Sequence, residues 1–244
     1  MKQGIFKIVE NVSLKCDTFR MKLEGDTSAI SAPGQFVNIK IDSLFLRRPI
    51  SVCDVDGNVL TIIYKVVGDG THAMAHMSVG QELDILTGLG NGYDISKTGD
   101  SPLLIGGGVG VPPMYYLAKQ LIASGKDVTV IMGFNTATEV FYAEEFEKLG
   151  AKVLVTTADG TQGIKGFVTA AIPQVKEISC ICACGPEPML KAIYDASSAP
   201  AYFSFEERMG CGFGACVGCT CKTKYGNKRI CKDGPVLERE EIVW

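Results

Sequence analysis

The chain has 244 residues, of which 46% are hydrophobic and 21% are charged, and this is the composition of a folded globular protein with room for two modest domains. Its net charge of −3, with no long run of Lys or Arg, argues against nucleic acid or an anionic membrane surface as a partner. The first residues lack the order of a signal peptide, and no apolar stretch approaches the roughly 18 residues of a membrane span. We therefore expect a cytoplasmic protein.

Residues 1–98 are expected to be all β. Short runs with apolar alternation, "QFVNIKI", "LTIIYKVV" and "ELDIL", are separated by turn sequences such as "APG", "DVDGN" and "VGDG". Strands at this spacing predict a small antiparallel barrel.

Residues 99–200 change to an alternation of strands and helices. The part begins with an apolar strand, the turn "GGGVGVPP" (residues 106–113), a helix and a second apolar strand. After these come a helix ("AEEFEKLG"), a strand ("KVLVTTADG"), a further helical stretch and the strand "ISCICACG". This order predicts parallel βαβ units. The glycine turn would let nucleotide phosphates meet N–H groups at a helix N-terminus. It does not fit G-x-G-x-x-G, and a tight turn without a ligand is the alternative.

Half of the ten cysteines fall within the last 34 residues. Cys211, Cys216 and Cys219 have the spacing C-x4-C-x2-C, and Cys231 follows after eleven residues. This is the plant-type ferredoxin spacing, so we predict that these four residues ligate a [2Fe–2S] cluster. Glycines between them permit a close wrap with N–H groups aimed at sulfur.

Structural zinc is the alternative for this loop. Zinc sites usually pair two C-x2-C knuckles or combine cysteine with histidine, and the two histidines, His72 and His76, lie far away in the sequence. Cys221 comes two residues after Cys219 in "CTCKT", where the alternation of a strand would turn its side chain away from the metal. We therefore predict that Cys221 is a packing residue and does not ligate metal. The remaining cysteines, Cys16, Cys53, Cys180, Cys182 and Cys184, are read as small apolar residues.

Five motifs resemble the ferredoxin–NADP reductase superfamily: "APGQF", "RRPISV", "IYKVVGDGT", "GGGVGVPP" and "CGPEPM". With the cysteine loop and the tail "RICKDGPVLEREEIVW", the chain is most similar to the branch formed by the electron-transfer subunits of NAD-dependent dihydroorotate dehydrogenases. The resemblance covers essentially the whole chain. It implies a multidomain β and α/β fold: a six-stranded antiparallel FAD-binding barrel (1–98), a parallel-sheet NAD-binding domain (99–203) and a small [2Fe–2S] domain (204–244).

The resemblance also implies which residues bind the cofactors. For FAD these are Arg48, Pro49, Ile50, Ser51, Ile63, Tyr64, Lys65, Gly70 and Thr71; for NAD they are Gly107, Gly108, Gly110, Cys184, Gly185 and Pro186. Arg48 would offer a bidentate cation to the FAD pyrophosphate. Ile50 departs from the flavin-stacking Tyr of many superfamily members, which leaves open what covers the isoalloxazine.

A flavin is needed because NAD exchanges electrons as hydride, in pairs, whereas a [2Fe–2S] cluster passes one at a time. No acid–base pair or nucleophile is required, so no catalytic residue is assigned, and His72 and His76 are read as structural or flavin-adjacent. The acidic stretch "GFNTATEVFYAEEFE" predicts NAD over NADP.

The resemblance implies an FMN-containing dihydroorotate dehydrogenase catalytic subunit as partner, two of each subunit, and a place in pyrimidine synthesis. The alternatives are a ferredoxin- or sulfur-linked NAD(P)H oxidoreductase subunit and a zinc-stabilised binding module without a redox role.

Overall fold

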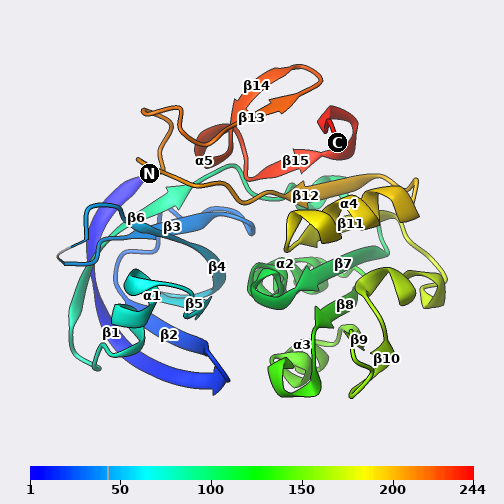
Figure 1. The fold of residues 1–244 in the computed structure, drawn as a ribbon, viewed down its shortest axis with the longest axis horizontal. Coiled ribbons are helices and arrows are strands. Elements are labelled where there is room, and N and C mark those ends of the chain that lie inside the picture. Colours follow the sequence, from blue (N-terminus) through cyan, green and yellow to red (C-terminus); the bar gives the residue numbers. More distant parts are fainter. Residues whose placement is uncertain (43) are drawn as a thin grey trace.

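The computed structural model describes residues 1–42 and 44–244. Three parts pack together in it (Figure 1): a β-barrel at the N-terminus, a largely parallel sheet with helices, and a C-terminal segment that lies across both. Within the described residues, no helix has the length and apolar character that crossing a membrane would require.

The N-terminal part is a closed antiparallel barrel of six strands, as predicted. Its order is β1-β2-β5-β4-β3-β6, and the strands are β1 (Lys2–Lys15), β2 (Thr18–Glu24), β3 (Phe36–Ile39), β4 (Arg48–Asp56), β5 (Val59–Lys65) and β6 (Glu82–Leu89). Alternate residues such as Phe6, Ile8, Met21 and Leu23 are fully enclosed and form the barrel core. Closure leaves no free sheet edge.

The expectation of an all-β N-terminal part is wrong at one place, because helix α1 (Asp69–Ala75) follows β5. The Thr71 hydroxyl accepts hydrogen bonds from the N–H groups of Val67 (3.0 Å) and Gly68 (3.3 Å), which fixes the first turn. Met74 then inserts into the barrel core. The run η1 (Ile95–Lys97) is a single 3₁₀ turn that leads out of the barrel.

The second part is a sheet of order β10-β9-β8-β7-β11-β12-β15. Six strands are parallel: β7 (Pro102–Gly107), β8 (Thr129–Phe134), β9 (Lys152–Thr157), β10 (Ile164–Lys165), β11 (Cys180–Cys184) and β12 (Ala201–Ser204). Their crossovers carry η2 (Gly108–Gly110), α2 (Val111–Ala123), η3 (Ala137–Glu139), α3 (Ala143–Leu149) and α4 (Glu187–Ala196). The βαβ prediction is therefore confirmed.

The helix expected between β9 and β11 is not formed. That crossover contains β10 and two 3₁₀ turns, η4 (Val168–Ala170) and η5 (Ile172–Gln174). Gly163 and Gly166, both at positive φ, and Pro173 leave no uninterrupted run for an α-helix.

The C-terminal segment begins after β12 and returns to the same sheet. It forms the hairpin β13 (Thr220–Thr223) and β14 (Gly226–Arg229), the short helix α5 (Ile230–Asp233), strand β15 (Val236–Glu238) and the turn η6 (Arg239–Glu241). Strand β15 pairs antiparallel with β12, with Leu237 opposite Phe203. The cysteine loop is therefore part of the connection between two neighbouring, hydrogen-bonded strands of the sheet.

The barrel and the sheet domain share a packed boundary. Lys119 of α2 forms an ion pair with Asp54 of β4 at 2.8 Å. The Tyr93 hydroxyl donates to the Ala183 carbonyl at 3.0 Å in a buried position. These contacts hold the barrel against the strands that carry the glycine turn.

Candidate functional site

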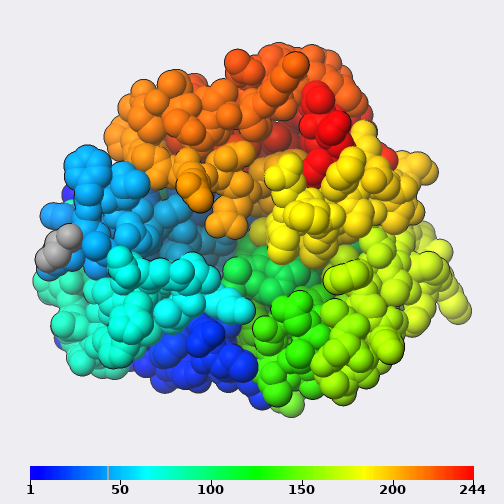
Figure 2. Space-filling model, viewed as in Figure 1, coloured from blue at the N-terminus to red at the C-terminus, as the bar shows by residue number. Residues whose placement is uncertain are grey.

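A cleft of about 620 Å³ lies where the three parts of the molecule meet. Its walls come from the start of β4 (residues 46–49), from the loop after β11 and the start of α4 (185–187 and 190), and from the residues after β12 (205–209). Figure 2 shows the orange C-terminal segment lying over the blue barrel and beside the yellow helix region. Residues predicted for FAD, for NAD and beside the cluster thus border a single cleft.

Two of the predicted FAD residues, Arg48 and Gly70, lie in direct contact. A Cβ on residue 70 would be 2.0 Å from Nε of Arg48. The Arg48 guanidinium therefore fills the space that a side chain at residue 70 of α1 would need. Arg48 also donates to the carbonyl of Leu46. The arrangement leaves a half-buried cation beside the cleft, which suits a diphosphate.

Strand β4 presents the next predicted residues in register with β3. Pro49 lies opposite Asn38, Ile50 opposite Val37 and Ser51 opposite Phe36. Pro49 lines the cleft, and Ile50 is half-buried against the barrel core.

On β5 the three predicted residues have different surroundings. The Tyr64 side chain is enclosed in the barrel, where its hydroxyl donates to Asn11 Oδ1 at 3.0 Å and burial raises its pKa. Ile63 packs into the core shared with the sheet domain. Lys65 lies 3.7 Å from a Glu139 carboxylate oxygen. The roles of these residues toward FAD stay predictions.

The two histidines lie together, His72 on α1 and His76 directly after the last residue of that helix. Their ring centroids are 4.5 Å apart, and His76 Nδ1 lies 2.8 Å from the His72 carbonyl oxygen. Both residues are exposed.

The predicted NAD residues flank the point where the strand order of the sheet reverses. The chain runs outward from β7 through β8, β9 and β10, then returns to place β11 on the other side of β7. In open α/β sheets the crevice at the carboxyl ends of such strands is where nucleotides bind. The turn 107–110 follows β7 and the loop 184–186 ends β11, with Cys184 opposite Gly106.

Glycine is required here because the two loops touch. A Cβ on Gly110 would lie 2.1 Å from the Cys184 carbonyl oxygen, and one on Gly107 would lie 2.4 Å from Met189 Sδ. Gly108 has φ +53° and Gly185 has φ +152°. Burial raises the pKa of the Cys184 thiol to about 12, so it is neutral at this edge. The loop 184–186 therefore brings main chain, and no charged side chain of its own, to this crevice.

The four predicted cluster cysteines come together as two pairs. Cys211 and Cys216 exchange N–H to Sγ contacts at 3.4 Å in both directions, and the Cys231 N–H donates to Cys219 Sγ at 3.4 Å. Cys211 Sγ also accepts from the N–H groups of Phe213 (3.5 Å) and Ala215 (3.2 Å). The loop therefore aims main-chain dipoles at sulfur, as a thiolate-ligated cluster requires.

The two pairs differ in their environments. Cys219 and Cys231 are each 2% exposed, and burial raises the pKa of Cys231 to about 12. Cys216 is exposed, and Cys211 is half-buried. Burial opposes ionisation of Cys211, but N–H donation by Cys216, Phe213 and Ala215 outweighs it and lowers its pKa to about 6.

The arrangement of these cysteines in two pairs suits a two-iron cluster. No three His, Cys, Asp or Glu side chains converge as ligands of one metal ion anywhere in residues 1–42 or 44–244. Two cysteines for each of two irons is the [2Fe–2S] requirement, and the chain offers two such pairs. Cys221 lies on β13 and packs against the apolar core below.

Sequence reasoning missed two residues at this site, Asn38 and Phe205. Asn38 of β3 is 1% exposed and donates from Nδ2 to the Cys211 carbonyl at 3.2 Å. Phe205 lines the cleft and packs on Trp244 with ring centroids 5.6 Å apart. Phe205 belongs to the segment "FSFEERMGCGFGACVGCTCKTK" that leads into the cysteine loop, but sequence reasoning assigns no role to it. For Asn38 the one signal is a polar residue within the run "QFVNIKI".

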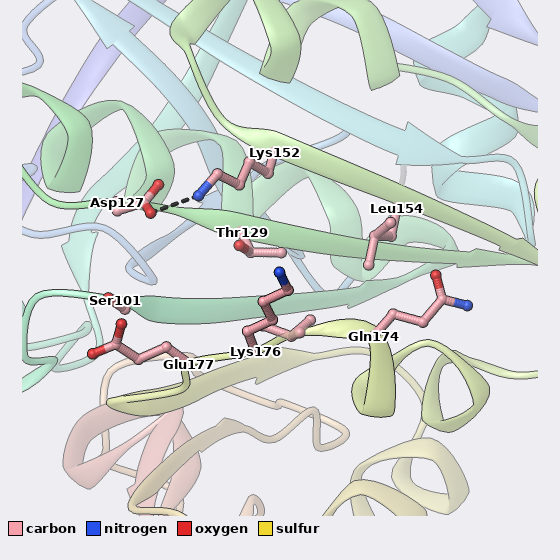
Figure 3. A pocket seen from close by; sticks show the side chains of 9 residues that line it. Ser101, Asp127, Thr129, Lys152, Leu154, Gln174, Lys176 and Glu177 are labelled. Carbon is pink, nitrogen blue, oxygen red and sulfur yellow. Dashed lines mark hydrogen bonds and ion pairs between the residues drawn. The ribbon is translucent and has the colours of Figure 1, made fainter.

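A second cavity, of about 480 Å³, lies at the opposite edge of the sheet. Figure 3 shows it among Ser101, Thr129 and Lys152, at the amino ends of β7, β8 and β9, and the loop 174–177. The Lys152 ammonium is paired with Asp127 at 2.6 Å. Nucleotides bind at the carboxyl ends of parallel strands, so this cavity is not the nucleotide site.

Comparison with known proteins agrees with this geometry. Residues 104–195 match the family described as oxidoreductase NAD-binding domain, and residues 206–243 match the iron–sulfur cluster binding domain of dihydroorotate dehydrogenase B. The second match favours iron–sulfur over zinc.

Solved structures show the same fold. The structure of an NADH-dependent reduced ferredoxin-NADP oxidoreductase aligns with TM-score 0.90 and 31% identity, over 99% of this chain and 90% of that chain. The FAD/NAD binding domain of a nitric oxide dioxygenase from Vibrio cholerae shares the fold with TM-score 0.69 at 21% identity, over 79% of this chain and 91% of that chain.

The barrel, the nucleotide crevice and the cysteine loop define an iron–sulfur flavoprotein oxidoreductase with FAD, NAD and [2Fe–2S] as cofactors. The electron transfer subunit of dihydroorotate dehydrogenase B (NAD(+)) from Fusobacterium nucleatum is 46% identical over 96% of both chains. That of Shouchella clausii is 42% identical over 99% of this chain and 98% of its own. The chain belongs to the family of electron transfer subunits of dihydroorotate dehydrogenase B, and such a subunit works with a catalytic partner.

Proposed function

We propose that this chain passes electrons from an FMN-containing dihydroorotate dehydrogenase subunit, by way of a [2Fe–2S] cluster and FAD, to NAD⁺ in cytoplasmic pyrimidine synthesis. The observation that carries the proposal is the shared cleft, because Arg48, Gly185 and Met209 line one space. A reductase needs its flavin within reach of both a nucleotide and a one-electron centre. This cleft is bordered by candidate residues for FAD and NAD and by Met209, which lies two residues before the predicted cluster ligand Cys211.

The residues supply binding and orientation. FAD, when bound, exchanges hydride with NAD and single electrons with the cluster. Arg48 would hold the FAD diphosphate, and the N–H groups of the turn 107–110 would hold that of NAD. Phe205, backed by Trp244, would close one wall of the cleft to water. Cys211, Cys216, Cys219 and Cys231 would hold the cluster.

The partner would dock on the cysteine loop. Phe213 and Val217 are 43% and 60% exposed and flank the exposed Cys216. Apolar side chains beside an exposed ligand favour a protein surface as the electron donor. Two copies of each subunit are the proposed complex.

A ferredoxin-linked role is the second candidate. It is favoured by the likeness to the NADH-dependent reduced ferredoxin-NADP oxidoreductase at 31% identity. The dihydroorotate dehydrogenase B subunit of Fusobacterium nucleatum is nearer, at 46%.

The decisive measurement is NADH formation at 340 nm from dihydroorotate, with and without the FMN subunit. We expect the isolated chain to oxidise NADH with an artificial acceptor and to leave dihydroorotate unchanged. Adding the FMN subunit should produce dihydroorotate-dependent NADH. If it does not, while FAD and cluster are intact and reduced ferredoxin supports NAD⁺ reduction, the ferredoxin-linked role replaces the proposal.

A further inference from the structure

We propose that Asn38 is a positioning residue that fixes the Cys211 side of the cluster against the flavin barrel; the inference rests on the proposed electron-transfer function. Asn38 lies on β3 of the barrel, and Cys211 belongs to the loop after β12. The Asn38 amide donates to the Cys211 carbonyl at 3.2 Å. A barrel strand thereby binds the main chain of a predicted cluster ligand directly.

The contact is closely packed on the loop side. Gly212 has φ +78°, and a Cβ there would lie 2.3 Å from Asn38 Nδ2. The loop therefore approaches the barrel at a residue without a side chain. Any displacement of Cys211 away from the barrel would have to break the Asn38 bond first.

The contact is also rigid on the barrel side. The Asn38 carbonyl accepts from Arg47 Nη1 at 3.3 Å, and Arg47 is ion-paired with Asp84 of β6 at 3.0 Å. Asn38 pairs in register with Pro49, which lines the cleft. The flavin cleft and the cluster ligand are thus connected through one strand pair and one side-chain hydrogen bond.

The bond from Asn38 to Cys211 requires that another polar atom of the Asn38 side chain be buried without a partner in the described part of the chain. Its Oδ1 is buried and has no hydrogen-bond partner among the described residues, whereas nearly all buried polar atoms in proteins have one. The Cys211 bond sets the amide orientation, because the nitrogen must face the carbonyl. An apolar residue would avoid the penalty, so the position favours a role beyond packing.

The consequence concerns the sulfur of Cys211. Its Sγ accepts from three main-chain N–H groups in the loop that the Asn38 bond holds. Hydrogen bonds to sulfur are one of the factors that set the reduction potential of a cluster. Without Asn38 the loop should relax, these bonds should lengthen, and the cluster should become harder to reduce.

The test uses the full chain with FAD and cluster, reduced by dithionite without any partner subunit. We compare Asn38→Leu, which keeps the shape and removes both polar groups, with Asn91→Leu. Asn91 is a matched control, since its amide also joins the barrel part to the C-terminal segment, at Val236 (2.8 Å) and Asp233 (3.4 Å), but makes no hydrogen bond to a cysteine among the described residues. If Asn38→Leu does not fold, Asn38→Ser replaces it in the test, because the smaller serine side chain is too short to reach the Cys211 carbonyl.

We expect Asn38→Leu or Asn38→Ser to shift the EPR g values and to make the cluster midpoint potential more negative, with FAD content unchanged. Asn91→Leu should lower the thermal midpoint and leave the EPR spectrum as in the wild type. Wild-type g values and potential in the Asn38 variants would overturn the inference, and so would equal shifts in Asn91→Leu. Neither result bears on dihydroorotate turnover by the wild-type complex, so the two proposals fail separately.

Discussion

Arg48 and Gly70 are in contact so close that residue 70 has no room for a side chain, since a Cβ there would lie 2.0 Å from Arg48 Nε. The contact joins strand β4 to helix α1 and holds the guanidinium at the rim of the cleft. Arg48 is half-buried, so it can turn away from an added methyl group. Residue 70 therefore controls where the cation lies.

Gly70→Ala should weaken FAD binding while leaving the fold intact. The methyl group would displace Arg48, and losing a charge-assisted hydrogen bond of about 1.5–3 kcal/mol corresponds to tenfold weaker binding or more. FAD titration by fluorescence measures this. Gly68→Ala is the control, because no atom lies within 4 Å of a Cβ there and its φ of −173° is open to any residue. Equal FAD affinity in both variants would contradict the role given to Arg48.

Serine substitution should separate the ligand cysteines from Cys221. Replacing Cys211, Cys216, Cys219 or Cys231 removes one member of a pair, so the visible absorption and EPR signal of the cluster should be lost. Cys221→Ser should keep both, since Cys221 packs on the apolar core. A cluster that survives Cys216→Ser but not Cys221→Ser would reverse the assignment.

NADH should be preferred over NADPH by at least about tenfold in kcat/KM. Glu139 follows β8, and acidic residues after this strand favour a free ribose 2′-hydroxyl. Lys65 lies 3.7 Å from the Glu139 carboxylate and is thereby partly neutralised. Glu139→Gln should narrow the preference for NADH by removing a negative charge that would repel a 2′-phosphate, whereas Glu144→Gln, on an 83% exposed side chain, should not. Equal efficiencies in the wild type would refute the preference.

Leu237→Ala should destabilise the protein and release the cluster. Leu237 is 2% exposed on β15, opposite Phe203, and removing such a side chain costs about 2–5 kcal/mol. Urea unfolding and iron content report the two effects. Glu238→Ala on the same strand removes an exposed ion pair with Lys97 and the Glu238 part of the η6 capping box, so its free energy of unfolding should change by about 1–2 kcal/mol and its iron content should not change. Full iron content in Leu237→Ala would show that β15 does not anchor the loop.

The features predicted from sequence are those that local patterns encode. The barrel strands alternate, the sheet strands are continuous apolar runs, and the turn 106–110 needs glycine for close approach. The spacing of the cysteines alone indicates a [2Fe–2S] cluster. These patterns extend over a few residues, so a single sequence contains them.

The missed features depend on residues far apart in the chain. Asn38 and Cys211 are 173 positions apart, and the pairing of β15 with β12 arises from tertiary packing. Strand alternation turns the Tyr64 side chain into the barrel, and its role toward FAD stays a prediction. Helix α1 is too short to have a periodic pattern, and a single Thr71 hydroxyl fixes its first turn.

The cysteine loop connects two strands that are hydrogen-bonded to each other, so its order bears on whether the protein stays in solution. Strand β15 covers the outer edge of β12, where Tyr202, Phe203 and Ser204 pair with it. An uncovered strand edge is a template for association with other chains. If the cluster were lost, the segment that delivers β15 would be free to loosen, and the edge of β12 would then be exposed. A damaged electron carrier would then leave solution by self-association, so that enzyme lacking its metal is removed from the functional pool.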